Sequence, residues 1–85
     1  MSIEADILLT SIRAARESTG LSQREVARRM GFHPTVWSKV ESGTRVLDVV
    51  EFVALARALG IDPISLLGGY LIKLQQNRVV EESTQ

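Results

Sequence analysis

Apolar residues recur at intervals of three and four along most of the chain, and glycines separate the segments in which they do so. These intervals fit the 3.6-residue turn of an α-helix and not the alternation of a strand. Glycine is favoured just past a helix end because it adopts the left-handed conformation without a Cβ clash. The punctuating glycines are Gly20, Gly31, Gly43, Gly60 and Gly68-Gly69. The pattern predicts helices over residues 3–18 (or from residue 5), 23–30, 34–42, 49–59, and from about 63 onward.

Residues that favour helix starts precede the later segments. Ser22 and Asp48 are each followed three residues later by glutamate, the spacing of a capping box. Asp62-Pro63 places an acid at the cap and proline at the first helical position, and His33-Pro34 does so with a weaker cap residue. The only β-prone stretch, residues 46–50, is short and interrupted by Asp48. The sequence therefore predicts an all-α fold, a compact five-helix bundle.

The helical spacing also predicts the core and the domain boundary. Residues 1–67 are expected to form one domain with its core in residues 12–67, and residues 68–85 a tail for dimerisation or a partner. Within the tail, residues 70–76 fit a short extra helix, and residues 79–85 are expected to be disordered. The side chains expected to face inward are Ile7, Leu8, Ile12, Ala15, Val26, Ala27, Met30, Trp37, Val40, Phe52, Val53, Leu55, Ala56, Leu59, Ile64, Leu66 and Leu67.

Composition excludes several classes of protein. At 85 residues the chain fits a single compact domain, and the absence of cysteine removes disulfides, thiolate nucleophiles and cysteine-ligated metals. A lone histidine, His33, does not build a metal site, so no cofactor or metal is expected. No apolar run approaches the ~18 residues of a membrane span, and the acidic start does not resemble a secretory signal. We expect a cytoplasmic protein with no membrane partner.

Charge is balanced overall but not along the chain. Ten basic and ten acidic residues cancel, yet residues 13–47 hold seven basic and three acidic residues, a net +4. Screening limits each charge to ~8–10 Å, so such a block attracts phosphate even in a neutral chain.

The most informative spacing begins at Gln23. Ala27 follows four residues on, Gly31 eight, Trp37 fourteen and Val40 seventeen. Two helices packed steeply across a short turn need a small residue at the crossing, a left-handed turn residue and apolar anchors on the second helix. The start and outer face of that second helix then point to solvent, and such a helix fits the ~12 Å major groove of DNA.

At this point the residues resemble a known family. Arg16 to Leu67 is similar to the lambda-repressor/Cro-type helix-turn-helix domain, the XRE family. The matching strings are Gly20-Leu21-Ser22-Gln23, residues 27–31, residues 37–43 and residues 55–60. The resemblance implies a sequence-specific regulator of transcription that binds double-stranded DNA with the third helix in the major groove.

The resemblance also assigns roles to individual residues. It places Thr35, Ser38 and Lys39 where base edges are reached; Lys39 suits guanine or a phosphate about equally. It implies a structural salt bridge between Arg16 and Glu41. Trp37 departs from the family pattern, which has Ile or Val at this position. Those residues have no indole N–H that needs a hydrogen-bond partner. The full set implied to contact DNA is Ser22, Gln23, His33, Pro34, Thr35, Ser38, Lys39, Ser42 and Arg45.

One short reading helix makes few base contacts, so a homodimer on adjacent half-sites is expected. The segment from Ile64 to Leu74 is more apolar than a small core requires. Two other functions stay open: the antitoxin of a toxin–antitoxin pair, with a toxin partner on the tail from Tyr70, or a protein-interaction domain that has lost DNA binding. An enzyme is least favoured, since no nucleophile has a base partner and no carboxylate pair is evident. The residues expected to form the dimer contact are Leu67, Tyr70, Leu71 and Leu74.

Overall fold

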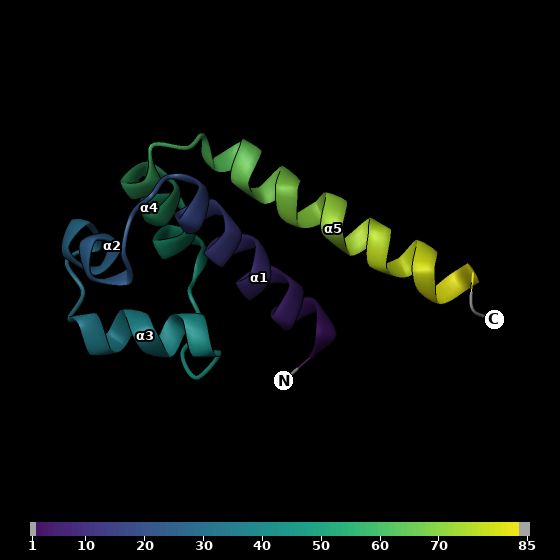
Figure 1. Cartoon of the computed structure of the whole chain (residues 1–85), viewed down its shortest axis with the longest axis horizontal. Helices are drawn as coiled ribbons and strands as arrows, with labels where there is room; N and C mark the ends of the chain where they lie inside the picture. The colour runs from purple at the N-terminus through teal and green to yellow at the C-terminus, as the bar shows by residue number, and fades with distance from the viewer. Residues whose placement is uncertain (1, 84–85) are drawn as a thin grey trace.

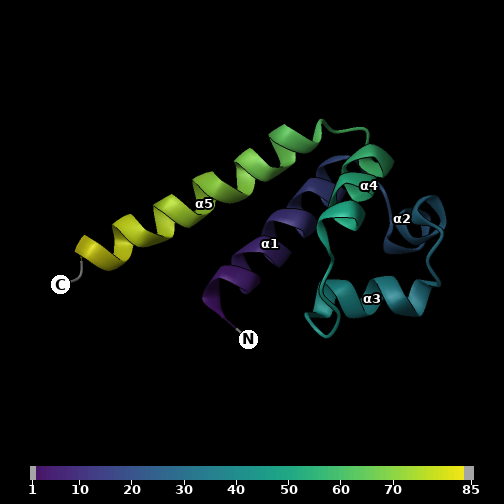
Figure 2. The same ribbon diagram turned by 180° about the vertical axis from the view of Figure 1, so that it is seen from behind.

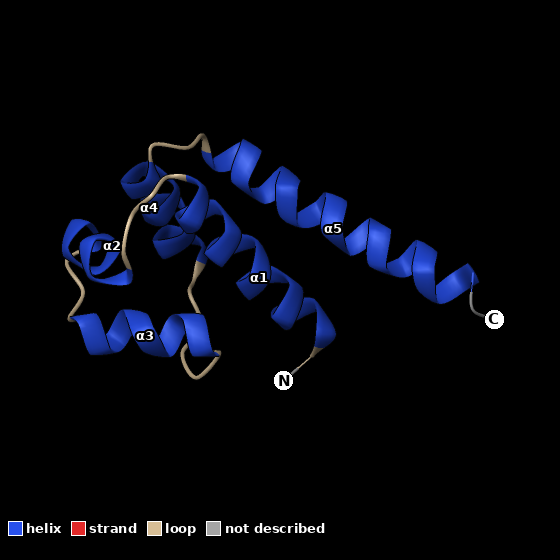
Figure 3. Cartoon of the chain, viewed as in Figure 1, coloured by secondary structure: helices blue, strands red, loops and turns tan. Residues whose placement is uncertain are grey.

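The chain folds into helices joined by short loops (Figures 1 and 3). The computed structural model describes residues 2–83, and the side chains of residues 2–77. Within that range there is no strand, and residues 46–48 are loop. The all-α, five-helix prediction is confirmed, and the first four helices have the predicted boundaries. They are α1 (Ile3–Ser18), α2 (Gln23–Met30), α3 (Pro34–Ser42), α4 (Val49–Leu59) and α5 (Pro63–Ser83).

Caps and glycines fix the ends of these helices. Gly31, Gly43 and Gly60 end α2, α3 and α4 in the left-handed conformation, with φ of 73°, 88° and 72°. The capping box at Asp48 is complete. The one predicted at Ser22 is only half formed: the serine hydroxyl accepts from the backbone of Glu25. The Glu25 carboxylate does not reach back, because it binds the two arginines that follow it on α2.

The core lies between the helices, where α2 packs against α3 and α4, α1 against α3 and α5, and α4 against α5. Trp37 is its largest fully buried side chain, and Ser11 and Glu41 are the buried polar residues of the described part. Ser11 satisfies its hydroxyl by donating to the Ile7 carbonyl one turn earlier, at 2.9 Å. The buried apolar residues are Ile12, Val26, Ala27, Trp37, Val40, Leu55, Ala56, Leu59 and Leu66.

The fifth helix differs most from the prediction. It runs without interruption through Gly68 and Gly69 to Ser83, across the expected domain boundary at residue 67. The separate short helix over residues 70–76 and the disorder expected from residue 79 are therefore wrong as far as Ser83; residues 84–85 lie outside the described range. Neither glycine has a positive φ. Packing of α5 along α1 outweighs the low helix propensity of the glycine pair.

Figures 1 and 2 agree on the arrangement: α1 lies in the middle, with α3 on one side and α5 on the other. The two helices α1 and α5 run antiparallel, and the C-terminal end of α5 projects past the start of α1. The third helix therefore lies far from α5 and at the edge of the molecule. A search of the described helices finds none long and apolar enough to cross a bilayer.

The glycines predict opposite effects of one substitution. Gly69→Ala should raise the free energy of unfolding by about 1 kcal/mol, because its φ is helical and nothing lies within 4 Å of the added Cβ. Gly60→Ala should lower it by about 1 kcal/mol, because φ is +72° there. Urea unfolding followed by circular dichroism measures both; a shift of the same sign for the two variants would contradict this reading of α5.

Candidate nucleic-acid interface

The turn between α2 and α3 sets the direction of α3. Gly31 adopts the left-handed conformation, and the backbone N–H of Phe32 then donates to the carbonyl of Ala27 at 2.8 Å. The Ala27 side chain is fully buried, which lets the two helix backbones approach closely. Because the reversal takes only three residues, α3 leaves α2 at a steep angle and runs along the edge of the molecule (Figure 1).

The third helix has one buried face and one open face. Trp37, Val40 and Glu41 point into the protein. The opposite side chains follow the spacing of a helix face and lie in solvent. His33 begins this face at the cap of α3, and Ser42 ends it. The exposed residues, all predicted from the sequence as DNA contacts, are His33, Pro34, Thr35, Ser38, Lys39 and Ser42.

The carboxylate of Glu41 anchors the buried face. Arg16 on α1 donates to it through two guanidinium nitrogens, Nε at 2.7 Å and Nη2 at 3.1 Å. Gln23 at the start of α2 donates through Nε2 at 3.2 Å. Trp37, one turn earlier on α3, donates its indole N–H at 2.5 Å. Arg13 adds an ion pair at 3.6 Å and a hydrogen bond to the Glu41 carbonyl at 2.9 Å. One carboxylate thus joins three helices.

This environment keeps Glu41 ionised. Burial alone would raise its pKa, but the hydrogen bonds from Arg16 and Trp37 outweigh burial, so the pKa lies below the ordinary value of 4.5. The Glu41 side chain is 2% exposed and that of Arg16 12%. Since both charges are largely removed from water, removing one partner leaves the other uncompensated.

The surroundings of Trp37 explain how the chain accommodates a tryptophan where the family pattern has isoleucine or valine. Its indole is fully buried, and the acid one turn later satisfies the indole N–H. The family resemblance implied a single partner for Glu41, namely Arg16. The i to i+4 spacing of Trp37 and Glu41 on a helix was a signal for this second contact.

The polar side chains of the predicted interface differ in whether they already make hydrogen bonds within the chain. The Ser22 hydroxyl accepts from the Glu25 N–H, and the Ser42 hydroxyl donates to the Lys39 carbonyl, so both have local partners. His33 accepts the Thr35 N–H at Nδ1, at 3.1 Å. Its proton in the neutral form is therefore on Nε2, which is left as a donor toward solvent.

Arg45 follows α3 and is partly committed within the chain. It donates to Glu51 on α4 at 2.7 Å and stacks over the Phe32 ring at 4.9 Å. Its Nη1 is buried without a hydrogen-bond partner among the described residues, and its side chain is 37% exposed. The hydrogen bond from Arg45 lowers the pKa of Glu51. This clamp between the turn and α4 was not foreseen from the sequence, and any phosphate contact by Arg45 competes with it.

Most basic residues of the block at residues 13–47 take part in ion pairs within the chain. Arg28 and Arg29 both pair with Glu25, and their hydrogen bonds lower the Glu25 pKa to about 2. Arg13 and Arg16 share Glu41. Among the described residues this leaves Lys39 and Arg24 as the cations of the block outside any ion pair, with Lys39 on the open face of α3.

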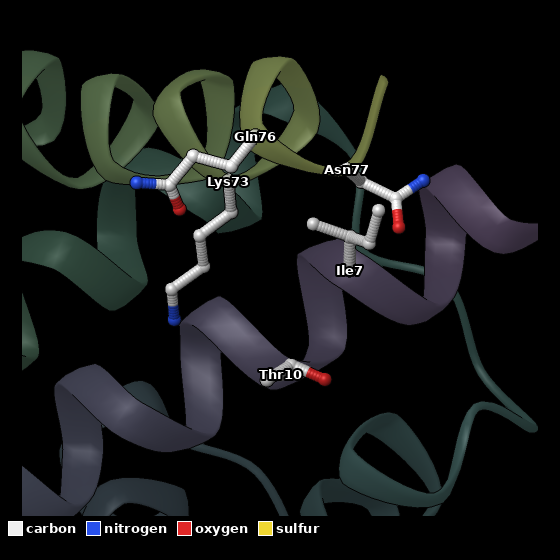
Figure 4. Close-up of a pocket in the computed structure, with 5 residues that line it drawn as sticks. All are labelled: Ile7, Thr10, Lys73, Gln76 and Asn77. Atoms are coloured by element: carbon white, nitrogen blue, oxygen red, sulfur yellow. The ribbon is translucent and has the colours of Figure 1, made fainter. Parts of the chain in front are cut away.

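The predicted dimer residues divide between two sides of α5. Leu67 and Leu71 are exposed and Leu74 is half-buried. Tyr70 instead turns toward α1, where its hydroxyl donates to the Glu4 carbonyl at 3.1 Å. Figure 4 shows a depression on that same inner side, with Lys73 extending from α5 toward α1.

Comparisons with known proteins agree with this architecture. The family model described as a helix-turn-helix domain matches residues 8–66. An XRE-family like protein from Pseudomonas syringae pv. tomato str. DC3000 is 36% identical, over 81% of this chain and 84% of that one, with a TM-score of 0.75. The restriction-modification controller protein C.AhdI from Aeromonas hydrophila is 31% identical over 76% and 98%, with a TM-score of 0.69.

A third solved structure shares the fold at lower identity. The clp gene regulator ClgR from Corynebacterium glutamicum is 19% identical and covers 98% of this chain and 88% of its own, with a TM-score of 0.82. A search of curated proteins finds no match.

Removing the central carboxylate should destabilise the fold strongly. Glu41→Ala is expected to lower the free energy of unfolding by about 3 kcal/mol, because it leaves the buried Arg16 charge and the Trp37 indole unpaired. Glu17→Ala is the matched control, since Glu17 is exposed on α1. Urea unfolding measured by circular dichroism compares the two; equal losses would show that the Glu41 contacts do not hold the helices together.

Acid should weaken the fold over a defined range. Glu25, Glu41 and Glu51 all have pKa values below 4.5 in the folded chain, so the unfolded chain binds more protons there. Stability is therefore full above about pH 4.5 and falls as pH decreases toward 2. Urea midpoints at pH 7, 4.5 and 3 measure the loss. Glu41→Gln, which does not titrate, should show a smaller loss than wild type, and an equal loss would contradict the role given to Glu41.

Proposed function

The chain belongs to the helix-turn-helix family in its XRE-type form, and from this we propose that it regulates transcription by binding double-stranded DNA as a dimer, with α3 in the major groove. The homologues it resembles are, by their names, a gene regulator and a controller protein as well as an XRE-family like protein.

The observation that carries the proposal is the division of α3 into a fixed face and an open face. Glu41 holds the inner face to α1 and α2, while Thr35, Ser38 and Lys39 lie in solvent. An α-helix with its side chains is about 10–12 Å in diameter, a size that enters the ~12 Å wide major groove, and the nine residues of α3 give it a length of about 13 Å. A helix anchored in this way needs no rearrangement before it meets the groove.

The open face offers distinct chemistry along its length. Lys39 carries a positive charge outside any ion pair of the described chain, and it suits guanine O6 or N7 or a phosphate. Thr35 offers a methyl to thymine, and Ser38 a hydroxyl that both donates and accepts. Pro34 has no donor and shapes the approach.

Phosphate contacts are expected from the flanks of α3. The start of α2 presents free N–H groups beside Gln23, whose amide already reaches Glu41 and so has a fixed orientation. His33 offers Nε2 at the start of α3. Ser22, Ser42 and Arg45 belong to the proposed set as well, with their local partners to be exchanged or shared.

Dimerisation supplies the specificity that one short helix lacks. Two copies on half-sites one helical turn apart, about 34 Å, double the number of base contacts. The exposed apolar side chains of α5, among them Leu67 and Leu71, offer the contact between copies. Helix α5 lies on the other side of α1 from α3, so pairing through α5 leaves both reading helices open (Figure 2).

The proposal predicts a specific loss for one lysine. Lys39→Ala should weaken binding to a selected duplex 10- to 100-fold in a band-shift titration, as expected for one base or phosphate contact of about 1–3 kcal/mol. The only other lysine, Lys73, points toward α1 and gives the control: Lys73→Ala should bind within about twofold of wild type.

The salt dependence separates the two readings of Lys39. If it neutralises a phosphate, the slope of log K against log salt falls by about one in the variant. If it reads guanine, the slope is kept and the sequence preference relaxes at one position. Wild-type protein that selects no duplex from a random pool would refute DNA binding, and binding without any salt dependence would refute the proposed phosphate contacts.

A further inference from the structure

Arg45, in the loop after α3, contacts the chain at both ends of that helix. Its backbone N–H donates to the carbonyl of Lys39, in the last turn of α3, at 3.1 Å. Its guanidinium lies 4.9 Å from the centre of the Phe32 ring, in the turn just before α3. A residue that contacts both ends of a nine-residue helix restricts how that helix can tilt or slide.

Glu51, in the first turn of α4, fixes the place of the Arg45 guanidinium. Its Oε2 accepts from Arg45 Nη2 at 2.7 Å. Its Oε1 accepts from the backbone N–H of Asp48 at 3.0 Å, which is one half of the capping box at the start of α4. Because both oxygens are engaged, the carboxylate has little freedom to turn. The start of α4 is therefore a fixed point that holds Arg45 over Phe32.

This clamp acts where the other anchor of α3 does not. The third helix packs mainly against α1 and α2, so the clamp supplies a link to α4 that helix packing does not. Glu41, which holds α3 to α1 and α2, lies near the C-terminal end of α3. The contact at Phe32 lies at the opposite end, next to the part of the open face that begins with Thr35. The clamp therefore controls the end of α3 that Glu41 reaches least.

A DNA phosphate could either take Arg45 away from Glu51 or leave the clamp closed. The geometry favours a closed clamp. Nη2 is engaged by Glu51, and Nη1 is buried with no hydrogen-bond partner among the described residues, so a phosphate does not reach Nη1 unless the side chain moves. Moving it would break the ion pair and the stacking on Phe32 together, in exchange for one phosphate contact.

We propose that Glu51 is a positioning residue for DNA binding. Through Arg45 it holds the start of α3 where Thr35 and Lys39 face the groove, and the Arg45–Glu51 pair stays closed on DNA. The inference rests on the DNA binding of the proposed function and goes beyond it, because Glu51 lies outside the proposed contact set. It assigns to an acidic side chain a part in binding a polyanion, which is the opposite of what its charge alone would suggest.

Glu51→Gln tests the sign of this effect. The variant loses the charge but keeps an oxygen for the capping contact with Asp48. It should bind the selected duplex about 3- to 10-fold more weakly in a band-shift titration, because a smaller fraction of the protein holds α3 in the binding position. The slope of log K against log salt should not rise, since no phosphate contact is gained. Glu17→Gln removes the same charge from an exposed position on α1 and should bind within about twofold of wild type.

A double-mutant cycle tests whether Glu51 acts through Arg45. Arg45→Met keeps an unbranched apolar stem and should weaken binding at least as much as Glu51→Gln. On the Arg45→Met background, Glu51→Gln should change the affinity by less than about twofold. Phe32→Leu leaves the ion pair and the capping box in place, and it should also weaken binding because the guanidinium loses the ring. Circular dichroism at the assay temperature checks that each loss concerns folded protein.

The outcomes separate this inference from the proposed function. Tighter binding by Glu51→Gln, with a salt slope higher by about one, would mean that DNA takes Arg45 from Glu51. That result, or an affinity equal to wild type, would overturn the positioning role and leave DNA binding standing. Additive losses in the cycle would overturn it as well, because the two residues would then act separately. Wild-type protein that binds no duplex would overturn the proposed function itself.

Discussion

The carboxylate of Glu41 receives hydrogen bonds from side chains of α1, α2 and α3, through Arg16, Gln23 and Trp37. Each bond fixes a different degree of freedom. The arginine fork sets how α3 lies against α1, the glutamine amide links α3 to the start of α2, and the indole keeps the carboxylate turned inward. A short helix has little intrinsic stability, so its orientation depends on such tertiary contacts. The open face of α3 points outward because the other face is held in this way.

Internal pairing also explains how a neutral chain can suit a negatively charged partner. Arg28 and Arg29 share Glu25, so one positive charge remains on that cluster, whereas Arg45 is balanced by Glu51. Arg13 and Arg16 likewise share Glu41, so the block keeps a local excess of positive charge although the whole chain is neutral. A polyanion at α3 therefore meets Lys39, helix N-termini and this local excess of positive charge, so the total charge of the chain says little about its partners.

Sequence rules that depend on neighbouring residues correctly predicted the helix ends that local interactions determine. The boundaries of α1 to α4 follow from glycines and capping residues within a few positions, and the chain obeys them. The same rules failed at Gly68-Gly69, because contact with α1, far away in the sequence, keeps α5 helical. They also failed for the Glu25 half of a capping box, where two nearby arginines compete more strongly for the carboxylate. The clamp of Arg45 on Phe32 and Glu51 depends on the loop path, which no periodicity encodes.

Trp37 is the only tryptophan of the chain, and its indole sits fully buried against Glu41. Indole emission depends on the polarity and charge around the ring. The protein therefore contains a natural optical reporter at the junction of its first three helices. Any event that loosens this junction changes the tryptophan fluorescence of an unlabelled sample. Events confined to the far end of α5 leave that fluorescence unchanged.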